Sequence, residues 1–335
     1  MFLDSIAVVI LILVIVFPFL LAWYISSILR KNRDLDRVRQ DRVTTRIEKL
    51  ARQTTEAIDS IRNSQIALNA NLDNAAKIIL HHSRFIDSQI KKLNELGYNV
   101  KPHIIDFSKY GVPQRRKRFI LVGSLNGKAN DFEPTIDKLK PIYLSEKGIR
   151  DTTTIGDAIS DLLCSNGTTN TPDRKNFKSG VYGKSNSNFQ NLMRGKYVQN
   201  DIIPDSHSFA HHSEETVKVF SSLIEHYPIK GKRIENKERE RWNIKKRGIT
   251  VLDSKQVSPT LTTHPDDYIH YSEPRILTVR EYARIQTFPD WYEIKKKYTT
   301  GGQMRKVEVP RYTQIGNAIP PLFAELAGLA LKEML

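Results

Sequence analysis

An uncharged apolar segment near the N-terminus constrains this chain more than any other feature. No charged residue interrupts the 25 residues from Ser5 to Leu29, SIAVVILILVIVFPFLLAWYISSIL. A helix needs only about 20 such residues to cross a bilayer. Arg30, Lys31 and Arg33 follow the segment, and only Asp4 precedes it. The positive-inside rule then predicts a single-pass membrane anchor over 5–29, with the N-terminus outside and the rest of the chain in the cytoplasm.

A cleaved signal peptide is the alternative to an anchor. Such a peptide begins with basic residues, has a shorter apolar core and ends at a small-residue cleavage site. This segment has no basic start, its apolar stretch is too long, and no such cleavage site follows it. The anchor is therefore the favoured interpretation, with the membrane as a partner.

Net charge and cysteine content limit the chemistry. The formal net charge of +15 favours a polyanionic partner, either nucleic acid or an anionic membrane surface. The lone cysteine, Cys164, excludes a disulfide within the chain and a cysteine-based zinc site. The histidines at 207, 211, 212 and 226 are irregularly spaced, so we expect polar surface there and no metal.

A helical stalk is predicted over residues 30–86. The stretch to residue 80 holds no Gly or Pro, and apolar residues between Val43 and Ile78 recur at the 3-4 spacing of a coiled-coil seam. Thr54, Ser64 and Asn71 interrupt that seam. A modest coiled coil, or a stalk packed on another protein, is favoured over a long stable rod.

Shorter elements are predicted after the stalk. Residues 90–100, IKKLNELGYNV, form an amphipathic pattern that Gly97 can end in the left-handed conformation. Strand-like runs follow at 101–107 and 118–123, and a helical pattern covers 151–163. Residues 164–195 have the Ser, Asn, Gly and Lys content of surface loops. In the C-terminal third, Thr278 and Glu281 form a capping-box pattern, and 322–335 has helical apolar spacing.

Two basic runs are candidates for function. Four consecutive cations, Arg115 to Arg118, stand directly before the apolar run FILVG. Residues i and i+2 of an extended strand share a face, so Gln114, Arg116 and Arg118 line one side and Arg115 and Lys117 the other. The second run, residues 230–247, holds many more cations than acids. Its ordinary interpretation is a solvated, partly helical face, and a patch for the DNA backbone is the alternative.

Three segments together resemble a known family. They are YGVPQRRKRFILVG at 110–123, SPTLTTHPDDYIHYSEPRILTVREYARIQTFPDWY at 258–292 and YTQIGNAIPPLFAEL at 312–326. They resemble, in order and spacing, the C-terminal half of the DNA cytosine-5 methyltransferases of restriction-modification systems. The matching family motifs are Q-x-R-x-R, a variable target-recognition region, R-x-L-T-x-R-E and G-N-A-x-P-P. The resemblance covers about residues 88 to 335.

The resemblance implies an α/β fold. It divides the chain into a partial, Rossmann-like catalytic sheet over 88–163, a target-recognition region over 164–257 and C-terminal motifs over 258–335. It implies that the R-x-L-T-x-R-E helix mainly organises the recognition region. Duplex DNA is the implied partner, read in the major groove and held through its phosphates.

The resemblance also implies site residues. Gln114, Arg116 and Arg118 would lie at the catalytic pocket, where guanidinium groups hold the carbonyl of a flipped cytosine and nearby phosphates. Gly316, Asn317 and Ala318 would pack against S-adenosylmethionine. The basic candidates for DNA contact are Lys232, Arg233, Arg239, Arg241, Lys245, Lys246 and Arg247.

Motifs that the family's chemistry requires do not occur in this sequence. The chain has no P-C-Q nucleophile, no E-N-V glutamate and no F-x-G-x-G cofactor turn, and Cys164 stands in the unrelated context DLLCSN. Three interpretations stay open. The chain is half of an enzyme completed by a separate chain, a membrane-tethered DNA-binding module without catalysis, or a methyltransferase remnant left by fusion or truncation.

Overall fold

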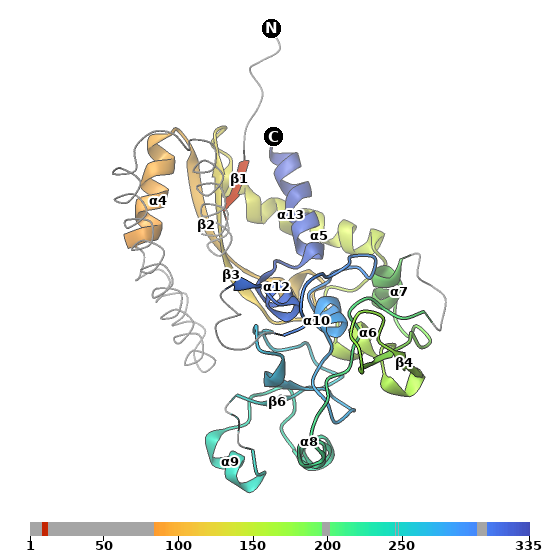
Figure 1. Ribbon diagram of the computed structural model, residues 1–335. Coiled ribbons are helices and arrows are strands. Elements are labelled where there is room, and N and C mark those ends of the chain that lie inside the picture. The colour runs from red at the N-terminus through yellow and green to blue at the C-terminus, as the bar shows by residue number, and fades with distance from the viewer. Residues whose placement is uncertain (1–8, 13–83, 196–201, 245, 247, 300–306) are drawn as a thin grey trace, which may run out of the picture. The chain divides into compact units, whose positions relative to one another are not determined.

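The computed structural model describes residues 9–12, 84–195, 202–244, 246, 248–299 and 307–335 (Figure 1). These residues divide into two compact units. Unit 1 comprises the described residues up to Ile105 together with Phe119–Pro134 and Met334–Leu335, and unit 2 comprises Asp106–Arg118 and Thr135–Glu333.

Unit 1 is built on a small sheet. Helix α4 (Arg84–Glu95) leads through Gly97, with a positive φ of 86°, into strand β2 (Asn99–Asp106). Strands β2 and β3 (Lys117–Ser124) run side by side in a three-stranded sheet of order β1-β3-β2 (Figure 1). Ile105, Ile120, Val122 and Phe132 are buried in this unit. The helix closed by Gly97 and both strands confirm the pattern of residues 90–123.

The predicted membrane anchor is wrong. Val9–Ile12 form strand β1, which pairs antiparallel with β3 in a register that runs from Val9↔Ser124 to Ile12↔Leu121. None of the helices in the described part of the chain is both long and apolar enough to cross a bilayer. Val and Ile favour strands as well as membranes, and pairing with β3 gives these residues backbone hydrogen-bond partners on one side without a helix. The predicted orientation, outside to cytoplasm, is therefore withdrawn.

The rest of the N-terminal predictions lies outside the described residues. This holds for the remainder of the 5–29 segment and for the stalk and its coiled-coil seam up to residue 83.

Unit 2 holds most of the elements. In chain order they are η2 (Phe107–Tyr110), α5 (Phe132–Glu146), α6 (Ile155–Ile159), η4 (Cys164–Asn166), β4 (Thr168–Asn170), β5 (Lys178–Gly180), α7 (Asn188–Arg194), α8 (Glu214–His226), α9 (Asn236–Arg241), β6 (Thr250–Val251), η5 (Pro265–Asp267), β7 (Tyr268–Ile269), α10 (Val279–Ile285), α12 (Arg311–Asn317) and α13 (Pro321–Met334). Helix α5 begins, and α13 ends, at residues that belong to unit 1. A three-residue 3-10 helix, η3 (Ala129–Asp131), precedes α5.

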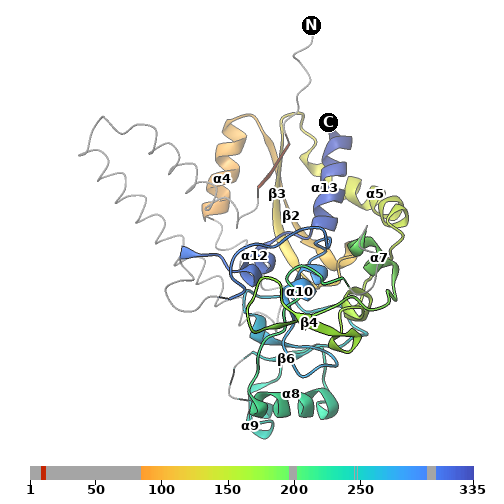
Figure 2. The same ribbon diagram turned by 45° about the vertical axis from the view of Figure 1, so that its right-hand side comes forward.

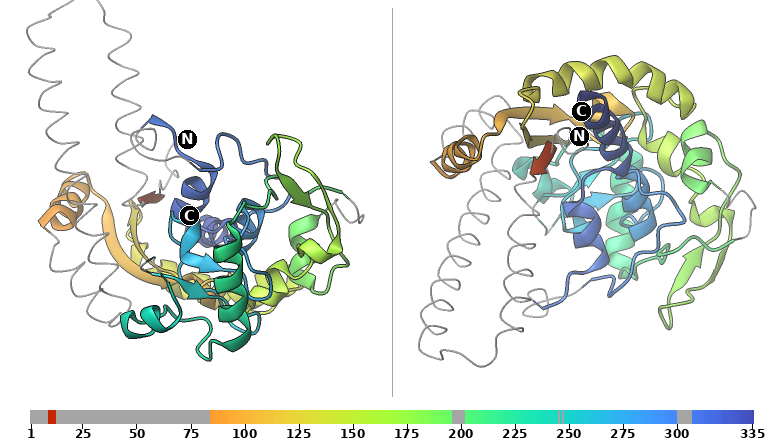
Figure 3. Two further views of the ribbon diagram at one scale, coloured as in Figure 1. Left: turned by 60° about the horizontal axis from the view of Figure 1, so that its bottom comes forward. Right: turned by 90° about the horizontal axis from the view of Figure 1, so that it is seen from above.

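Capping boxes set the start of two packed helices. The Thr278 side chain accepts from the Glu281 amide at the start of α10, and Thr154 and Asp157 do the same for α6. Helix α10 packs on both α6 and α12. In Figure 3, α10 is the light-blue helix and α12 is the darker blue helix beside it. The helix predicted over 151–163 exists, but it is confined to Ile155–Ile159.

One buried hydrophobic cluster in unit 2 joins α8, β6 and β7. Helices α8 and α9 lie near β6 at one end of the unit (Figure 2). The cluster consists of Phe220, Leu223, Tyr227, Ile234, Ile244, Ile249, Val251, Ile269 and Ile276. Residues 164–195 are more ordered than their loop-like composition predicts, because β4 and β5 pair antiparallel there and α7 follows them.

Candidate functional site

The site begins with a tight turn that leads into the basic run. Gly111 has a φ of 76°, and a Cβ on it would lie 3.1 Å from side-chain atoms of Leu144 and Ile149. Only glycine combines that backbone conformation with that little space. Its amide donates to the Asp151 carbonyl at 2.9 Å. The turn therefore fixes where the next residues, through Arg118, can point.

Side chains after the turn alternate as an extended segment requires. Gln114 and Arg116 are buried, Arg115 and Lys117 are exposed, and Arg118 is half-buried. Backbone bonds hold the segment in place, because the Arg115 amide donates to the Ser258 carbonyl at 2.8 Å. The predicted division of the run into two faces agrees with this burial.

Arg116 joins three distant segments. Its guanidinium donates from Nη1 to the Leu261 carbonyl at 3.0 Å and from Nη2 to the Gly316 carbonyl at 2.6 Å. The Gln114 side-chain oxygen accepts from the Leu261 amide at 2.8 Å and from Arg116 at 3.4 Å. We call Gln114, Arg116, Leu261 and Gly316 the motif clamp. The motif clamp joins all three sequence motifs: Gln114 and Arg116 belong to the first, Leu261 to the second and Gly316 to the third.

Burial governs the electrostatics of the motif clamp. Arg116 is 1% exposed, and burial, followed by the nearby Arg118 charge, holds its pKa well below its usual value. Within the described residues, its hydrogen bonds all go to neutral oxygens. Arg116 Nε and Gln114 Nε2 are buried there without a hydrogen-bond partner. The two terminal nitrogens of Arg116 thus hold the three segments together.

Gly316 completes the clamp because it has no side chain. A Cβ there would lie 2.7 Å from the Thr262 carbonyl oxygen, which is closer than real Cβ atoms approach. The neighbouring carbonyl of Ile315 accepts from the Gln286 side chain at 3.0 Å, which ties α12 to α10. Asn317 is exposed at the end of α12, and Ala318 is half-buried just after it. Among the three predicted cofactor residues, only Gly316 joins the clamp.

Arg118 is the less committed arginine of the pair. It is half-buried, and among the described residues its guanidinium donates to the adjacent Lys117 carbonyl at 2.8 Å. Burial lowers the pKa of Arg118 to about 10, so the group stays cationic at neutral pH. Its charged head is therefore available for a ligand in a way that the head of Arg116 is not.

The predicted DNA-contact residues that the structure describes fall into two groups. Lys232, Arg233 and Arg241 are exposed. Arg239 and Lys246 are engaged within the protein, since Arg239 Nε donates to the Lys246 carbonyl at 3.1 Å and Lys246 pairs with Asp267 at 2.9 Å. Lys245 and Arg247 lie outside the described residues.

The R-x-L-T-x-R-E segment stabilises unit 2 through ion pairs of its arginines. Arg275 makes two bonds to the Glu281 carboxylate, at 2.8 and 2.7 Å, and one to Glu273 at 2.7 Å. Burial opposes the charge of Arg275, but the Glu281 and Glu273 carboxylates outweigh it and raise its pKa. Arg280 donates to Asp205 at 2.8 Å. These contacts match the organising role that the sequence predicts for this helix.

A second buried network was missed at the sequence level. Arg284 pairs with Asp290 at 2.6 Å and with Asp161 at 3.3 Å, and Arg194 also bonds Asp161, at 2.7 Å. Tyr182 donates to Asp290 at 2.6 Å. The Arg284 and Asp161 partners stand 123 residues apart, so no local spacing could have revealed the pair. This buried ion network packs α6, α7 and α10 together.

Cys164 lacks the surroundings of a nucleophile. Its thiol belongs to an exposed residue, and burial of the sulfur, followed by the Glu273 charge, raises the pKa. A raised pKa leaves less of the reactive thiolate. One histidine also differs from expectation, since His207 is buried and bonds Thr278 Oγ1 at 2.8 Å and the Leu162 carbonyl at 3.0 Å. The described residues contain no cluster of three or more potential metal ligands.

Comparison with known proteins now assigns the chain to a class. The family model for C-5 cytosine-specific DNA methylases matches residues 54–333. The chain therefore belongs to the C-5 cytosine-specific DNA methylase family. The match starts ahead of residue 88, where the resemblance in sequence begins, and so lies partly inside the segment predicted as a stalk.

Curated relatives are type II methyltransferases. M.Bpa9945I of Bacillus paralicheniformis is 29% identical over 286 residues, which are 78% of this chain and 59% of the relative. M.AquIB of a Picosynechococcus species is 45% identical over 86 residues, which are 25% of this chain and 62% of the relative. This chain thus spans about three-fifths of the length of these relatives.

One solved structure is also similar. The crystal structure of a proposed DNA modification methyltransferase encoded within an Escherichia coli prophage aligns with 76% of this chain and 65% of its own. The sequence identity is 21% and the TM-score is 0.46. The family assignment rests on the sequence matches.

Proposed function

We propose that this chain supplies the C-terminal half of a DNA cytosine-5 methyltransferase of restriction-modification type. In this proposal it contributes the Q-x-R-x-R arginines and the target-recognition surface, and a separate chain contributes the cofactor turn and the nucleophilic cysteine. The observation that carries the proposal is the motif clamp, where Arg116 joins Leu261 and Gly316 across three motif segments. The clamp gives the C-terminal motifs a coherent packing among themselves.

The two arginines have different roles in this proposal. Arg116 is a positioning residue, since its bonds hold the clamp. Arg118 contacts the flipped cytosine, where its planar donors suit the ring carbonyl and an adjacent phosphate. Arg118 follows the clamp by two residues, so the clamp fixes the backbone from which Arg118 extends.

S-adenosylmethionine is the proposed cofactor, and it supplies the methyl group when bound. The residues here fit it in part. The Gly316 carbonyl already accepts a hydrogen bond from Arg116, and Thr262 fills the space that a Cβ would need. Gly316 therefore contributes through the position of its backbone. The exposed amide of Asn317 offers a donor and an acceptor at the end of α12. Asn317 is therefore our candidate for direct contact with the cofactor, and Ala318 for packing beside it.

Absence of a nucleophile supports the need for a complementing chain. The sequence has no P-C-Q motif, and Cys164 combines an unrelated context with a raised thiol pKa. The relative M.AquIB is itself much shorter than this chain, since the same 86 residues are 62% of it and 25% of this chain. The family therefore includes a curated protein that is shorter than this chain.

Residues 164–257 are proposed as the target-recognition region. Their core is formed mainly by residues of α8, β6 and the intervening segments, and it carries Lys232, Arg233 and Arg241 on an exposed surface. Cations on such a surface neutralise DNA phosphates. A DNA-binding module without catalysis is the second candidate function, favoured by the same exposed cations.

Transfer of a labelled methyl group from S-adenosylmethionine to duplex DNA tests the proposal. The full chain is assayed alone and then mixed with a chain that carries both the P-C-Q and F-x-G-x-G motifs. We expect transfer only in the mixture. Duplex binding without transfer in either sample would favour the DNA-binding module, and loss of both would overturn each candidate.

A further inference from the structure

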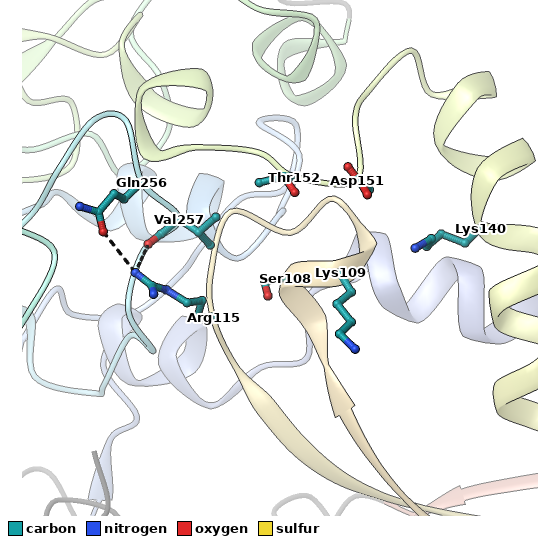
Figure 4. A pocket seen from close by; sticks show the side chains of 8 residues that line it. All are labelled: Ser108, Lys109, Arg115, Lys140, Asp151, Thr152, Gln256 and Val257. Atoms are coloured by element: carbon teal, nitrogen blue, oxygen red, sulfur yellow. Dashed lines mark hydrogen bonds between the residues drawn. The ribbon is translucent and has the colours of Figure 1, made fainter. Parts of the chain in front are cut away.

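A polar cavity in unit 2 lies outside the motif clamp. It has a volume of about 440 Å³, within the roughly 300–1,000 Å³ range typical of ligand sites. The lining residues are Ser108, Lys109, Arg115, Lys140, Asp151, Thr152, Gln256 and Val257. Figure 4 shows Lys109 and Lys140 on one side of the cavity, with Arg115 facing Gln256 and Val257 on the other.

Charge and donors make the cavity suited to an anion. Three cations, Lys109, Arg115 and Lys140, line the cavity together with a single carboxylate, Asp151. Arg115 uses only Nη2 in its two long bonds, at 3.4 Å to Gln256 Oε1 and 3.5 Å to the Val257 carbonyl. Among the described residues, the other guanidinium donors of Arg115 make no hydrogen bond. Cations that come from separate segments and line one cavity can donate to the oxygens of a phosphate.

Solvent access suits a phosphate that remains part of a long polymer. Lys109, Arg115, Asp151 and Thr152 are exposed, and Lys140 is half-buried. The lining therefore stays in contact with water instead of enclosing a small molecule. A backbone phosphate of a duplex keeps one side solvated in the same way.

The cavity is continuous with the basic recognition segment. Its wall residue Gln256 lies against Gly231, because a Cβ on Gly231 would be 2.8 Å from Gln256 Oε1. Gly231 directly precedes the exposed cations Lys232 and Arg233. On the other side, Arg115 belongs to the run that ends in Arg118. The cavity thus lies between the recognition segment and the arginine that we place at the flipped base.

We propose that this cavity, bounded by Lys109, Arg115 and Lys140, holds a backbone phosphate of the duplex. The site deepens the proposed function and rests on it. It keeps the duplex in register between the recognition surface and Arg118, without reading base sequence. An acidic segment of the complementing chain is the competing occupant.

The test is binding of the full chain to a short fluorescent duplex at several salt concentrations. Each phosphate contact adds about 0.9 to the slope of log affinity against log salt. Lys140→Gln should lower that slope by about 0.9 and weaken binding severalfold, and Lys140→Arg should keep both near wild type. Lys138→Gln is the matched control, because Lys138 lies on the same helix, carries the same charge and pairs with Glu333 outside the cavity.

Each outcome decides a different point. Equal slopes for Lys140→Gln and Lys138→Gln, with normal wild-type binding, would overturn the cavity proposal and leave the proposed function standing. No duplex binding by the wild-type chain would overturn the proposed DNA contact and the cavity with it. Weaker association of Lys140→Gln with the complementing chain, at unchanged duplex binding, would assign the cavity to an acidic protein segment.

Discussion

The motif clamp and the basic segment at 230–247 use the same kinds of side chain in opposite surroundings. In the clamp, Arg116 is 1% exposed and both of its terminal nitrogens donate to protein oxygens. In the basic segment, the Arg241 side chain is 75% exposed and its ion pair with Glu238 is 3.8 Å long. A guanidinium in the first setting holds the fold, whereas one in the second is available to a polyanion.

This contrast shows that residues of one sequence motif can have different roles. The family motif marks both Arg116 and Arg118 equally in sequence, but only Arg118 keeps its charged head largely uncommitted. Buried arginines should therefore affect stability when they are replaced, and exposed ones should affect DNA binding. Each prediction below tests whether a residue stabilises the fold or is available to bind DNA.

The largest effect is expected from the buried ion network. Arg284→Met removes the main partner of Asp290, whose remaining ion pair, with Arg280, is 3.8 Å long, and leaves Asp161 with Arg194. Breaking such a pair costs about 3–5 kcal/mol of unfolding free energy. Denaturant titration followed by circular dichroism measures the loss. Arg241→Met, at an exposed position, should change stability by less than about 0.5 kcal/mol. Similar losses in both variants would remove the distinction.

A smaller effect is expected at the clamp glycine. Gly316→Ala places a Cβ 2.7 Å from the Thr262 carbonyl, and overpacking of this kind costs about 1–3 kcal/mol. Gly328→Ala is the matched control, since nothing lies within 4 Å of a Cβ at that helical position. It should stabilise the chain by about 0.5–1 kcal/mol. Thermal unfolding of both variants checks the opposite signs, and a shared sign would contradict the close approach at Gly316.

Acid should weaken the same buried network. Burial alone would raise the pKa of Asp290, but Arg284 outweighs it and holds the pKa below the ordinary 3.8. A depressed carboxylate pKa contributes stability above the unfolded value, and that stability is lost as pH falls through the folded value. Unfolding free energy should thus drop below about pH 4. Asp290→Asn should flatten this pH dependence, and an unchanged slope would assign acid sensitivity to other groups.

The smallest effects on stability are expected at the exposed cations. Lys232→Gln should lower the salt slope of duplex binding by up to about 0.9 and leave unfolding unchanged. Lys246→Gln should alter the slope less, because Lys246 already pairs with Asp267 at 2.9 Å. Fluorescence anisotropy across a salt series compares the two. A larger slope change for Lys246→Gln would mean that ion pairing does not decide which cations are available.

Local patterns predicted much of unit 2 and part of unit 1. The Thr278 and Glu281 capping box, the strand over FILVG and the helix ended by Gly97 depend on neighbours in sequence, and each formed as expected. The membrane prediction failed because apolar length does not distinguish a spanning helix from a strand paired at a sheet edge, as β1 is.

Contacts between residues distant in sequence limited how much of the site could be predicted. Alternation correctly divided Arg116 from Arg115, but it could not show that Arg116 bonds a carbonyl 200 residues away. His207 was expected on the surface because its partners, Thr278 and the Leu162 carbonyl, are distant in sequence. Nor could spacing reveal that Lys246 is already paired. Such contacts depend on tertiary packing, which one sequence does not encode in its local periodicity.

The central claim is that Arg118 acts on the substrate while Arg116 holds the fold. The most direct test measures unfolding free energy for Arg118→Ala and Arg116→Ala, and methyl transfer by each variant in a mixture with the complementing chain that we propose. We expect Arg118→Ala to lose transfer with nearly wild-type stability, and Arg116→Ala to lose stability as well. Full transfer by Arg118→Ala, or equal destabilisation by both variants, would contradict the account.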